Sequence, residues 1–98
     1  MVQRRRKPTH PGAILREDLL PELSITQKEL AERLGVSRLT VSELLHKKRS
    51  LSPDMAIRLA HLFNTTPESW LNMQQALDLW LLKTEKAEEY RSIHAVAA

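Results

Sequence analysis

Apolar residues recur along this chain with helical spacing, and no segment convincingly alternates apolar and polar residues with the period of two that marks a strand. Only two glycines occur in the 98 residues, so long stretches run without interruption. Helix-capping residues, or prolines suited to a first helical turn, precede the apolar runs. The pattern therefore predicts an all-α fold of five helices joined by short connections.

The first predicted helix covers residues 11–20. Pro11 can occupy its first position, where a helix needs no backbone donor, and Pro21 is expected to end it. Before it, residues 1–8 contain the run "RRRK" and are expected to form a flexible basic arm. The residues expected to face inward are Ile14, Leu15 and Leu19.

The second predicted helix begins after Thr26, where "TQKE" has the form of a capping box. In such a box the Glu29 carboxylate reaches back to the Thr26 amide. Gly35 then provides the left-handed residue that ends the helix. The apolar stripe between these signals is Leu30, Ala31 and Leu34.

Three further helices start with the same devices. Ser37 caps a third helix that reaches about His46, "SPD" at 52–54 starts a fourth, and "TPE" at 66–68 starts a fifth that runs to about residue 90. Residues 9–92 are thus predicted to form one domain, followed by a frayed tail at 93–98. The apolar stripe of the fourth helix is Met55, Ile57, Leu59, Ala60, Leu62 and Phe63.

About three residues around Gly35 join the second and third helices, which is the spacing of a helix-turn-helix, here over residues 26–46. At 100° per residue, the third helix has an apolar inner side and a chemically mixed outer side. An idle solvent-facing side would carry more Lys–Glu pairs at i,i+4 spacing. The mixture favours a surface that reads DNA over a plain helical hairpin. The inner residues are Val41, Leu44 and Leu45, and the outer ones are Arg38, Leu39, Thr40, Ser42, Glu43 and His46.

Side chains on and around the third helix match known contacts to DNA. Arg38 can pair with O6 and N7 of guanine, Leu39 can pack on a thymine methyl, and Glu43 can accept from N4 of cytosine. Glu43 can instead pair with Lys47 one turn along, and both roles stay open. The groups suited to phosphate are Ser37, Thr40 and Ser42, Gln27 at the start of the second helix, and the basic run Lys47, Lys48 and Arg49. The basic run can instead be a solubilising loop.

The charge distribution favours an anionic partner. Residues 1–60 hold 12 Lys and Arg against 7 Asp and Glu, whereas residues 61–98 hold 3 against 5. A basic half beside a slightly acidic one is typical of a protein that binds nucleic acid, although ordinary solvated charge would look similar.

Other functional classes lack their signals. The chain has no cysteine, which excludes thiolate metal sites and fits the cytoplasm, where we expect this protein. No apolar run approaches the roughly 20 residues of a membrane span. No glycine-rich phosphate loop or carboxylate pair is evident, and we expect no enzyme activity, metal or cofactor. The histidines that lack a metal-ligand spacing are His10, His46, His61 and His94.

The fifth helix is apolar on more than one side, which exceeds what docking on its own domain requires. The surplus predicts a homodimer through this helix, because DNA readers of this type use two copies to span half-sites. The alternative is that both tryptophans belong to the intramolecular core. The predicted interface residues are Trp70, Met73, Leu77, Trp80 and Leu81.

The segment "TQKELAERLGVSRLTVSELL" resembles the helix-turn-helix of Cro/repressor (XRE) proteins. With "HPGAILREDLL" at 10–20 and "SPDMAIRLAHLFNTTPESWLNMQQALDLW" at 52–80, the chain resembles the HigA antitoxins, also called VapI-like, over about residues 8–82. The most specific part of the match is "PESWLNMQQALDLW". One departure concerns the residues after the third helix, where the family usually has Asn-Gly-Lys and this chain has His46-Lys47-Lys48, without the glycine that easily adopts a left-handed conformation.

The resemblance implies a type II antitoxin that binds its operator DNA as a homodimer. It would neutralise a HigB-type toxin, a RelE-like mRNA endonuclease, and repress its own operon. By the same resemblance, the base contacts are Arg38, Leu39, Thr40 and Glu43, and the backbone contacts include Gln27, Ser37 and Ser42. We expect the toxin to bind near the N-terminal region and the first helix. The rival hypotheses are a repressor without a toxin and a protein-only inhibitor that has lost DNA binding.

Overall fold

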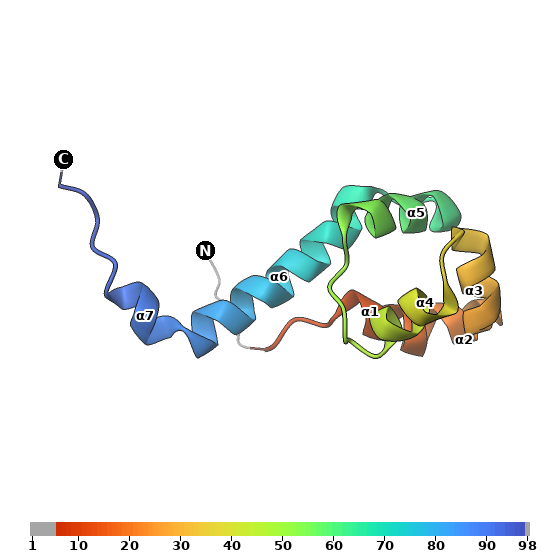
Figure 1. The fold of residues 1–98 in the computed structure, drawn as a ribbon, viewed down its shortest axis with the longest axis horizontal. Helices are drawn as coiled ribbons and strands as arrows, with labels where there is room; N and C mark the ends of the chain where they lie inside the picture. The colour runs from red at the N-terminus through yellow and green to blue at the C-terminus, as the bar shows by residue number, and fades with distance from the viewer. Residues whose placement is uncertain (1–5, 98) are drawn as a thin grey trace.

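The computed structural model describes residues 6–97, and its regular elements within that range are all helical (Figure 1). The predicted all-α fold is therefore confirmed. Residues 1–5 of the predicted basic arm lie outside the described residues. The elements are α1 (Pro11–Ile14), the π-helical segment η1 (Leu15–Leu19), α2 (Leu20–Leu23), α3 (Gln27–Leu34), α4 (Arg38–Leu45), α5 (Pro53–Phe63), α6 (Pro67–Glu85) and α7 (Ala87–Arg91).

The first predicted helix does not end at Pro21, because a π-helical turn carries the chain past the proline. The Leu20 amide donates to the carbonyl of Leu15, five residues back. This wider turn relieves the clash that a proline ring makes with the carbonyl four residues before it in an α-helix. The helical path therefore continues to Leu23. Leu15 and Leu20 are buried five residues apart, whereas Leu19, predicted to face inward, is only partly buried.

The four helix starts predicted at capping residues are confirmed. Each cap oxygen accepts from the backbone amide three residues later, as in Thr26 with Glu29 at 3.1 Å. The return bond predicted for the capping box differs: the Glu29 carboxylate accepts from the Thr26 hydroxyl at 3.3 Å, whereas the predicted donor was the Thr26 amide. Gly35 ends α3 at φ 71°, as predicted. The four caps are Thr26, Ser37, Ser52 and Thr66.

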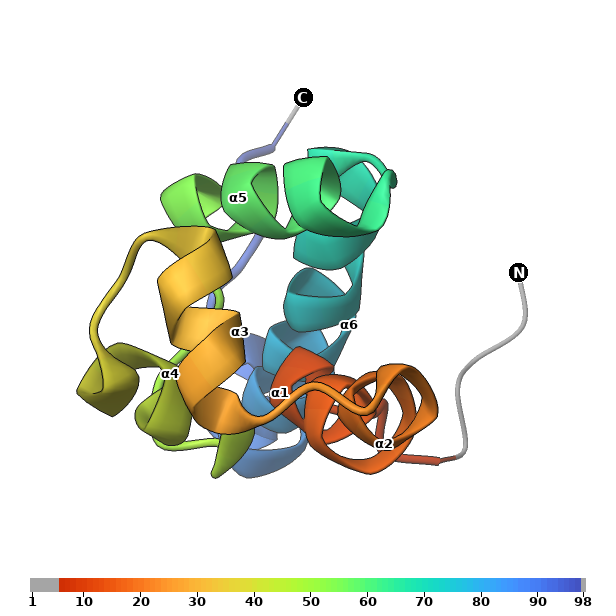
Figure 2. The same ribbon diagram turned by 90° about the vertical axis from the view of Figure 1, so that its right-hand side faces the viewer.

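The core lies between α5 and the helices of the N-terminal half, with α6 closing one side (Figure 2). Met55, Ala56, Leu59 and Ala60 are the buried residues of α5. Ile57, predicted to be in the apolar stripe, is 50% exposed. It lies two residues, and therefore 200° of helical rotation, beyond Met55, so that it faces solvent when Met55 and Leu59 face the core.

Helix α6 starts against α5 and then extends out of the globular body, which gives the molecule its long axis of 53 Å (Figure 1). The prediction of one helix reaching residue 90 is wrong: α6 ends at Glu85, and the short α7 follows after Lys86. No residue of α7 is buried. A polar segment without a packed face has only its own backbone hydrogen bonds to keep it helical, so a break there costs little.

The start of α1 lies directly against the end of α4. A Cβ atom on Gly12 would stand 1.9 Å from the Leu44 carbonyl oxygen, so the close approach requires glycine. His10 caps α1, because its Nδ1 accepts from the Gly12 amide at 2.9 Å. Burial lowers the pKa of His10 below its ordinary value and nearby Lys47 lowers it further, while the Arg49 backbone and Asp78 oppose the shift.

Replacing Gly12 with alanine should destabilise the protein by roughly 1–3 kcal/mol, because the added methyl group forces α1 away from the end of α4. The free energy of unfolding in urea measures this. The sign of the change in unfolding free energy tests the close packing, because a glycine-to-alanine substitution in an unobstructed helix stabilises a protein by up to about 1 kcal/mol. A more stable Gly12→Ala protein would contradict the close packing of α1 on α4.

Candidate nucleic-acid interface

Helix α4 is held by its inner side and presents its outer side to solvent, as a recognition helix requires. The predicted inner residues Val41, Leu44 and Leu45 are all buried. On the outer side, Arg38 is exposed and Leu39 is 68% exposed. Arg38 makes no hydrogen bond or ion pair within residues 6–97. Its five N–H donors are thus available to an incoming ligand.

The hydroxyls at the start of α4 are partly committed to holding the helix. Ser37 Oγ accepts from the Thr40 amide at 3.1 Å, and the hydroxyls of Ser37 and Thr40 share a hydrogen bond of 2.9 Å. One of the two O–H groups is used in that bond, which leaves a single hydroxyl donor for DNA. Ser37 and Thr40 therefore act as a pair at this surface, although they were predicted as separate backbone and base contacts.

Glu43 pairs with Arg49, and not with Lys47 as one alternative proposed. Its Oε1 lies 3.0 Å from Arg49 Nη2, and both side chains are partly exposed. The pair brings Arg49, predicted to hold phosphate, back over the outer side of α4. A surface pair of this kind contributes about 0–1 kcal/mol, so either partner can be released at low cost.

The chain turns sharply after α4, and Lys47 takes the left-handed conformation at φ 61°. His46, the first residue of the segment that lacks the family's glycine, keeps a negative φ of −92°. The turn is closed by backbone bonds from Lys47 to Leu44 at 3.1 Å and from Lys48 to Glu43 at 2.8 Å. This is the Schellman arrangement, in which glycine is usual. Both lysines are exposed at the end of α4.

The remaining predicted backbone contacts lie beside this surface. Gln27 is the exposed first residue of α3, where free amides and the helix dipole favour an anion. Ser42 is partly buried on α4, and its carbonyl accepts from the His46 amide at 3.0 Å and lies 2.8 Å from His46 Nδ1. Figure 2 shows α3 and α4 as adjacent helices, so these residues share one region of the molecule.

Comparison with known proteins decides the family. The helix-turn-helix family HTH_3 matches residues 15–71, more than half of the chain. The chain belongs to this helix-turn-helix family.

The relatives of this helix-turn-helix protein include proteins named as transcriptional regulators and proteins named as antitoxins. It is 46% identical to the uncharacterised HTH-type transcriptional regulator YbaQ of Escherichia coli, over 99% of this chain and 88% of the relative. It is 40% identical to the antitoxin HigA-1 of Vibrio cholerae, over 95% of this chain and 88% of the relative. Its structure matches the antitoxin GraA in complex with its operator at a TM-score of 0.88 and 37% identity, over 100% of both chains. The resemblance to HigA-type antitoxins is thereby confirmed.

Membership of a DNA-binding family agrees with the prediction that the protein is not an enzyme. Within residues 6–97, no three His, Cys, Asp or Glu side chains gather as metal ligands would. No helix in the described part of the chain is both long and apolar enough to cross a bilayer.

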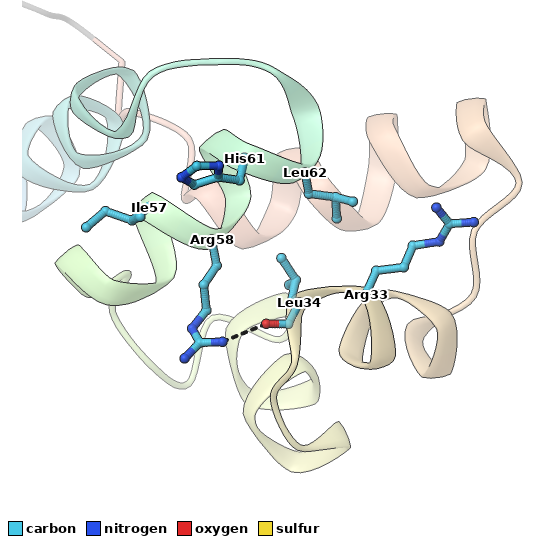
Figure 3. Close-up of a pocket in the computed structure, with 6 residues that line it drawn as sticks. All are labelled: Arg33, Leu34, Ile57, Arg58, His61 and Leu62. Atoms are coloured by element: carbon cyan, nitrogen blue, oxygen red, sulfur yellow. Dashed lines mark hydrogen bonds between the residues drawn. The ribbon is translucent and has the colours of Figure 1, made fainter.

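Two arginines outside the motif, which the sequence did not single out, contact the ends of its helices. Arg58 of α5 donates to the Leu34 carbonyl at 2.7 Å, beside a shallow pocket (Figure 3). Arg16 of η1 donates to the Leu45 carbonyl at 3.1 Å. Arg33 and His61, which also line the pocket, point to opposite sides of it and do not converge on a ligand (Figure 3). The contacts of Arg16 and Arg58 were not predictable from local spacing, because each joins residues more than twenty positions apart.

The residues predicted to form the dimer interface divide into two groups. Trp70 and Leu77 are each 4% exposed, and the Trp70 indole donates to Thr65 Oγ1 at 2.8 Å, so these two belong to their own chain's interior. For them the intramolecular alternative holds. Met73, Trp80 and Leu81 are partly buried. The apolar residues of α6 that are most exposed are Leu79 at 46% and Leu82 at 39%.

Replacing Lys47 with glycine should stabilise the protein by about 1 kcal/mol relative to Lys48→Gly, because only Lys47 has a positive φ. Both variants lose one lysine and gain the backbone freedom of a glycine, so these two effects cancel when their stabilities are compared. Urea denaturation of both variants measures the difference. Equal stability of the two variants would show that Lys47 is not strained.

Proposed function

We propose that this protein is the antitoxin of a type II toxin–antitoxin pair. It binds its operator as a homodimer, represses its own operon and neutralises a HigB-type, RelE-like mRNA endonuclease. The observation that carries the DNA-binding part is α4, which is anchored by three buried residues and presents an exposed leucine and an exposed arginine that has no partner within residues 6–97. The full-length similarity to an antitoxin bound to its operator supports the same role.

In this proposal the outer side of α4 enters the major groove. Arg38 pairs with a guanine, Leu39 packs on a thymine methyl, and the Ser37–Thr40 pair offers its remaining hydroxyl donor. Glu43 reads a cytosine only after releasing Arg49, which then binds phosphate. Lys47, Lys48 and Gln27 hold the backbone on either side of the helix.

The homodimer places two α4 helices on successive major grooves, about 34 Å apart. The exposed leucines of α6, Leu79 and Leu82, lie about 60° apart around the helix and form the surface that best fits a second copy, with the partly buried Trp80 and Leu81 beside them. These residues belong to the last two turns of α6, and α6 extends out of the globular body (Figure 1). A projecting helix with apolar side chains gains by burying them against its symmetry mate.

A stand-alone repressor without a toxin is the second candidate, favoured by the name of the Escherichia coli relative, a transcriptional regulator. The two candidates share the DNA-binding chemistry and the dimer. They differ only in whether a toxin binds, which a direct assay resolves.

Arg38→Ala should weaken binding to DNA from upstream of the gene by roughly 1–3 kcal/mol and relax the preference at one base pair. The matched control is Arg33→Ala, which removes an exposed arginine of α3 with the same loss of charge. Titrations by fluorescence anisotropy at several salt concentrations measure both. Equal affinities of the Arg38→Ala and Arg33→Ala proteins for this DNA would contradict the proposed base contact of Arg38.

The double variant Leu79→Glu/Leu82→Glu should be a monomer, because four buried carboxylates would face each other across the dimer. Ile57→Glu places a charge at a similarly exposed apolar site on α5 and should leave the dimer intact. Sedimentation equilibrium distinguishes the two. A dimeric double variant would exclude this part of α6 as the interface.

The small protein encoded beside this gene should inhibit translation in a cell-free extract, and addition of this protein should restore it. The two proteins should also co-purify as a complex. Arg38→Ala should restore translation as well as the unaltered protein does, since toxin binding is expected near α1 and away from the recognition helix. A neighbour that is neither inhibitory nor bound would favour the stand-alone repressor.

A further inference from the structure

Every α-helix leaves its last four carbonyls without a partner inside the helix, and in α4 all four find one. The carbonyls of residues 42–44 accept from the backbone amides of residues 46–48, at distances between 2.8 and 3.1 Å. The carbonyl of Leu45 is different. It accepts from the guanidinium of Arg16, which is 29 residues earlier in the chain.

This contact suits the chemistry of a helix end. The C-terminus of α4 carries the negative end of the helix dipole, and a guanidinium there adds a charge-assisted hydrogen bond to a favourable dipole interaction. Arg16 Nη1 makes the bond to Leu45, and Nη2 binds Glu17 Oε1 at 2.8 Å. The side chain is therefore held at both ends of its fork and is only one-third exposed.

Two further contacts attach the same N-terminal segment to the end of α4. The backbone at Gly12 lies against the Leu44 carbonyl with no room for a methyl group. The buried ring of His10 interacts with the backbone of Arg49 in the loop that follows. The C-terminal end of α4 is thus fixed by α1 and η1, whereas its N-terminal end is fixed by the turn at Gly35.

The turn itself is braced in a similar way. Arg58 Nη1 donates to the Leu34 carbonyl at the end of α3 (Figure 3). Arg58 Nε donates to Asp54 Oδ2 at 2.8 Å. Each helix of the motif therefore ends on an arginine supplied from outside it. With the turn braced, a tilt of α4 would have to displace its far end, where Arg16 donates to the Leu45 carbonyl.

We propose that Arg16 is a positioning residue for operator recognition, acting through the Leu45 carbonyl. It fixes the direction of α4 and the placement of the loop that carries Lys47 and Lys48. The inference rests on the proposed DNA-binding function. It predicts that specific binding depends on Arg16 more than non-specific binding does, because phosphate contacts tolerate a displaced helix and base contacts do not.

Arg16→Ala should lower affinity for the operator roughly fivefold to tenfold, while affinity for random-sequence DNA of equal length changes less than about twofold. In the free protein, the backbone carbonyl carbon of Leu45 should shift upfield in the NMR spectrum as its hydrogen bond is lost. The amides of Lys47 and Lys48 should exchange faster with solvent. The carbonyl shift reports the contact directly, and a general loss of stability would not single out that atom.

Glu17→Gln is the matched control. It removes the ion-pair partner of Arg16 but leaves the bond to Leu45, and it should keep both the operator affinity and the Leu45 resonance. Arg16→Lys retains a cationic donor and should recover most of the affinity. Arg16→Met keeps the stem without a donor and should bind as weakly as Arg16→Ala. If Arg16→Ala does not fold, the test rests on Arg16→Lys and Arg16→Met. Equal operator affinities of these two variants would overturn the proposal.

Arg38→Ala, measured in parallel, separates this inference from the proposed function. Normal operator affinity in Arg16→Ala with weakened affinity in Arg38→Ala would overturn the positioning role alone. Normal affinity in both would overturn the base-reading surface as well. Equal losses on operator and random DNA in Arg16→Ala would make Arg16 a phosphate contact in place of a positioning residue.

Discussion

An eight-residue helix cannot hold its shape in water, and α4 is a helix of eight residues. Its conformation depends on tertiary contacts: three buried side chains on the inner side, a serine cap at the start and a complete set of partners for the carbonyls at the end. Much of the remaining structure serves that anchorage. Gly12 of α1 and Arg16 of η1 contact the end of α4, and Arg58 of α5 contacts the end of the helix before it.

Because α4 is secured from within, its outer side is free to carry chemistry that contributes nothing to folding. Arg38 and Leu39 extend into solvent without partners in the described part of the chain. Ser37, Thr40, Glu43 and Arg49 instead satisfy one another in the free protein. These interactions are weak and exposed, so an incoming ligand can replace them at low cost.

The helix starts were predictable from sequence because capping is local. A threonine or serine oxygen reaches an amide three residues away whatever the rest of the chain does. The inner side of α4 was predictable for a similar reason, since periodicity depends only on helical geometry. Predictions failed where the packing of the folded chain decided the outcome. Pro21 lies within a helix because a π turn accommodates it. Ile57 faces solvent because Met55 and Leu59 of the same helix face the core, and Trp70 lies in the core against Phe63.

The sequence by itself therefore determined the all-α class, the helix-turn-helix and the residues of its two sides, because these follow from spacing and from groups only a few bonds apart. Only the tertiary structure decided which residue becomes left-handed after α4, which arginine Glu43 binds and which helix secures the end of α4. The physical reason is distance along the chain. Arg16 and Leu45 are 29 residues apart, and nothing in the spacing of either segment records that folding brings a guanidinium to a carbonyl there.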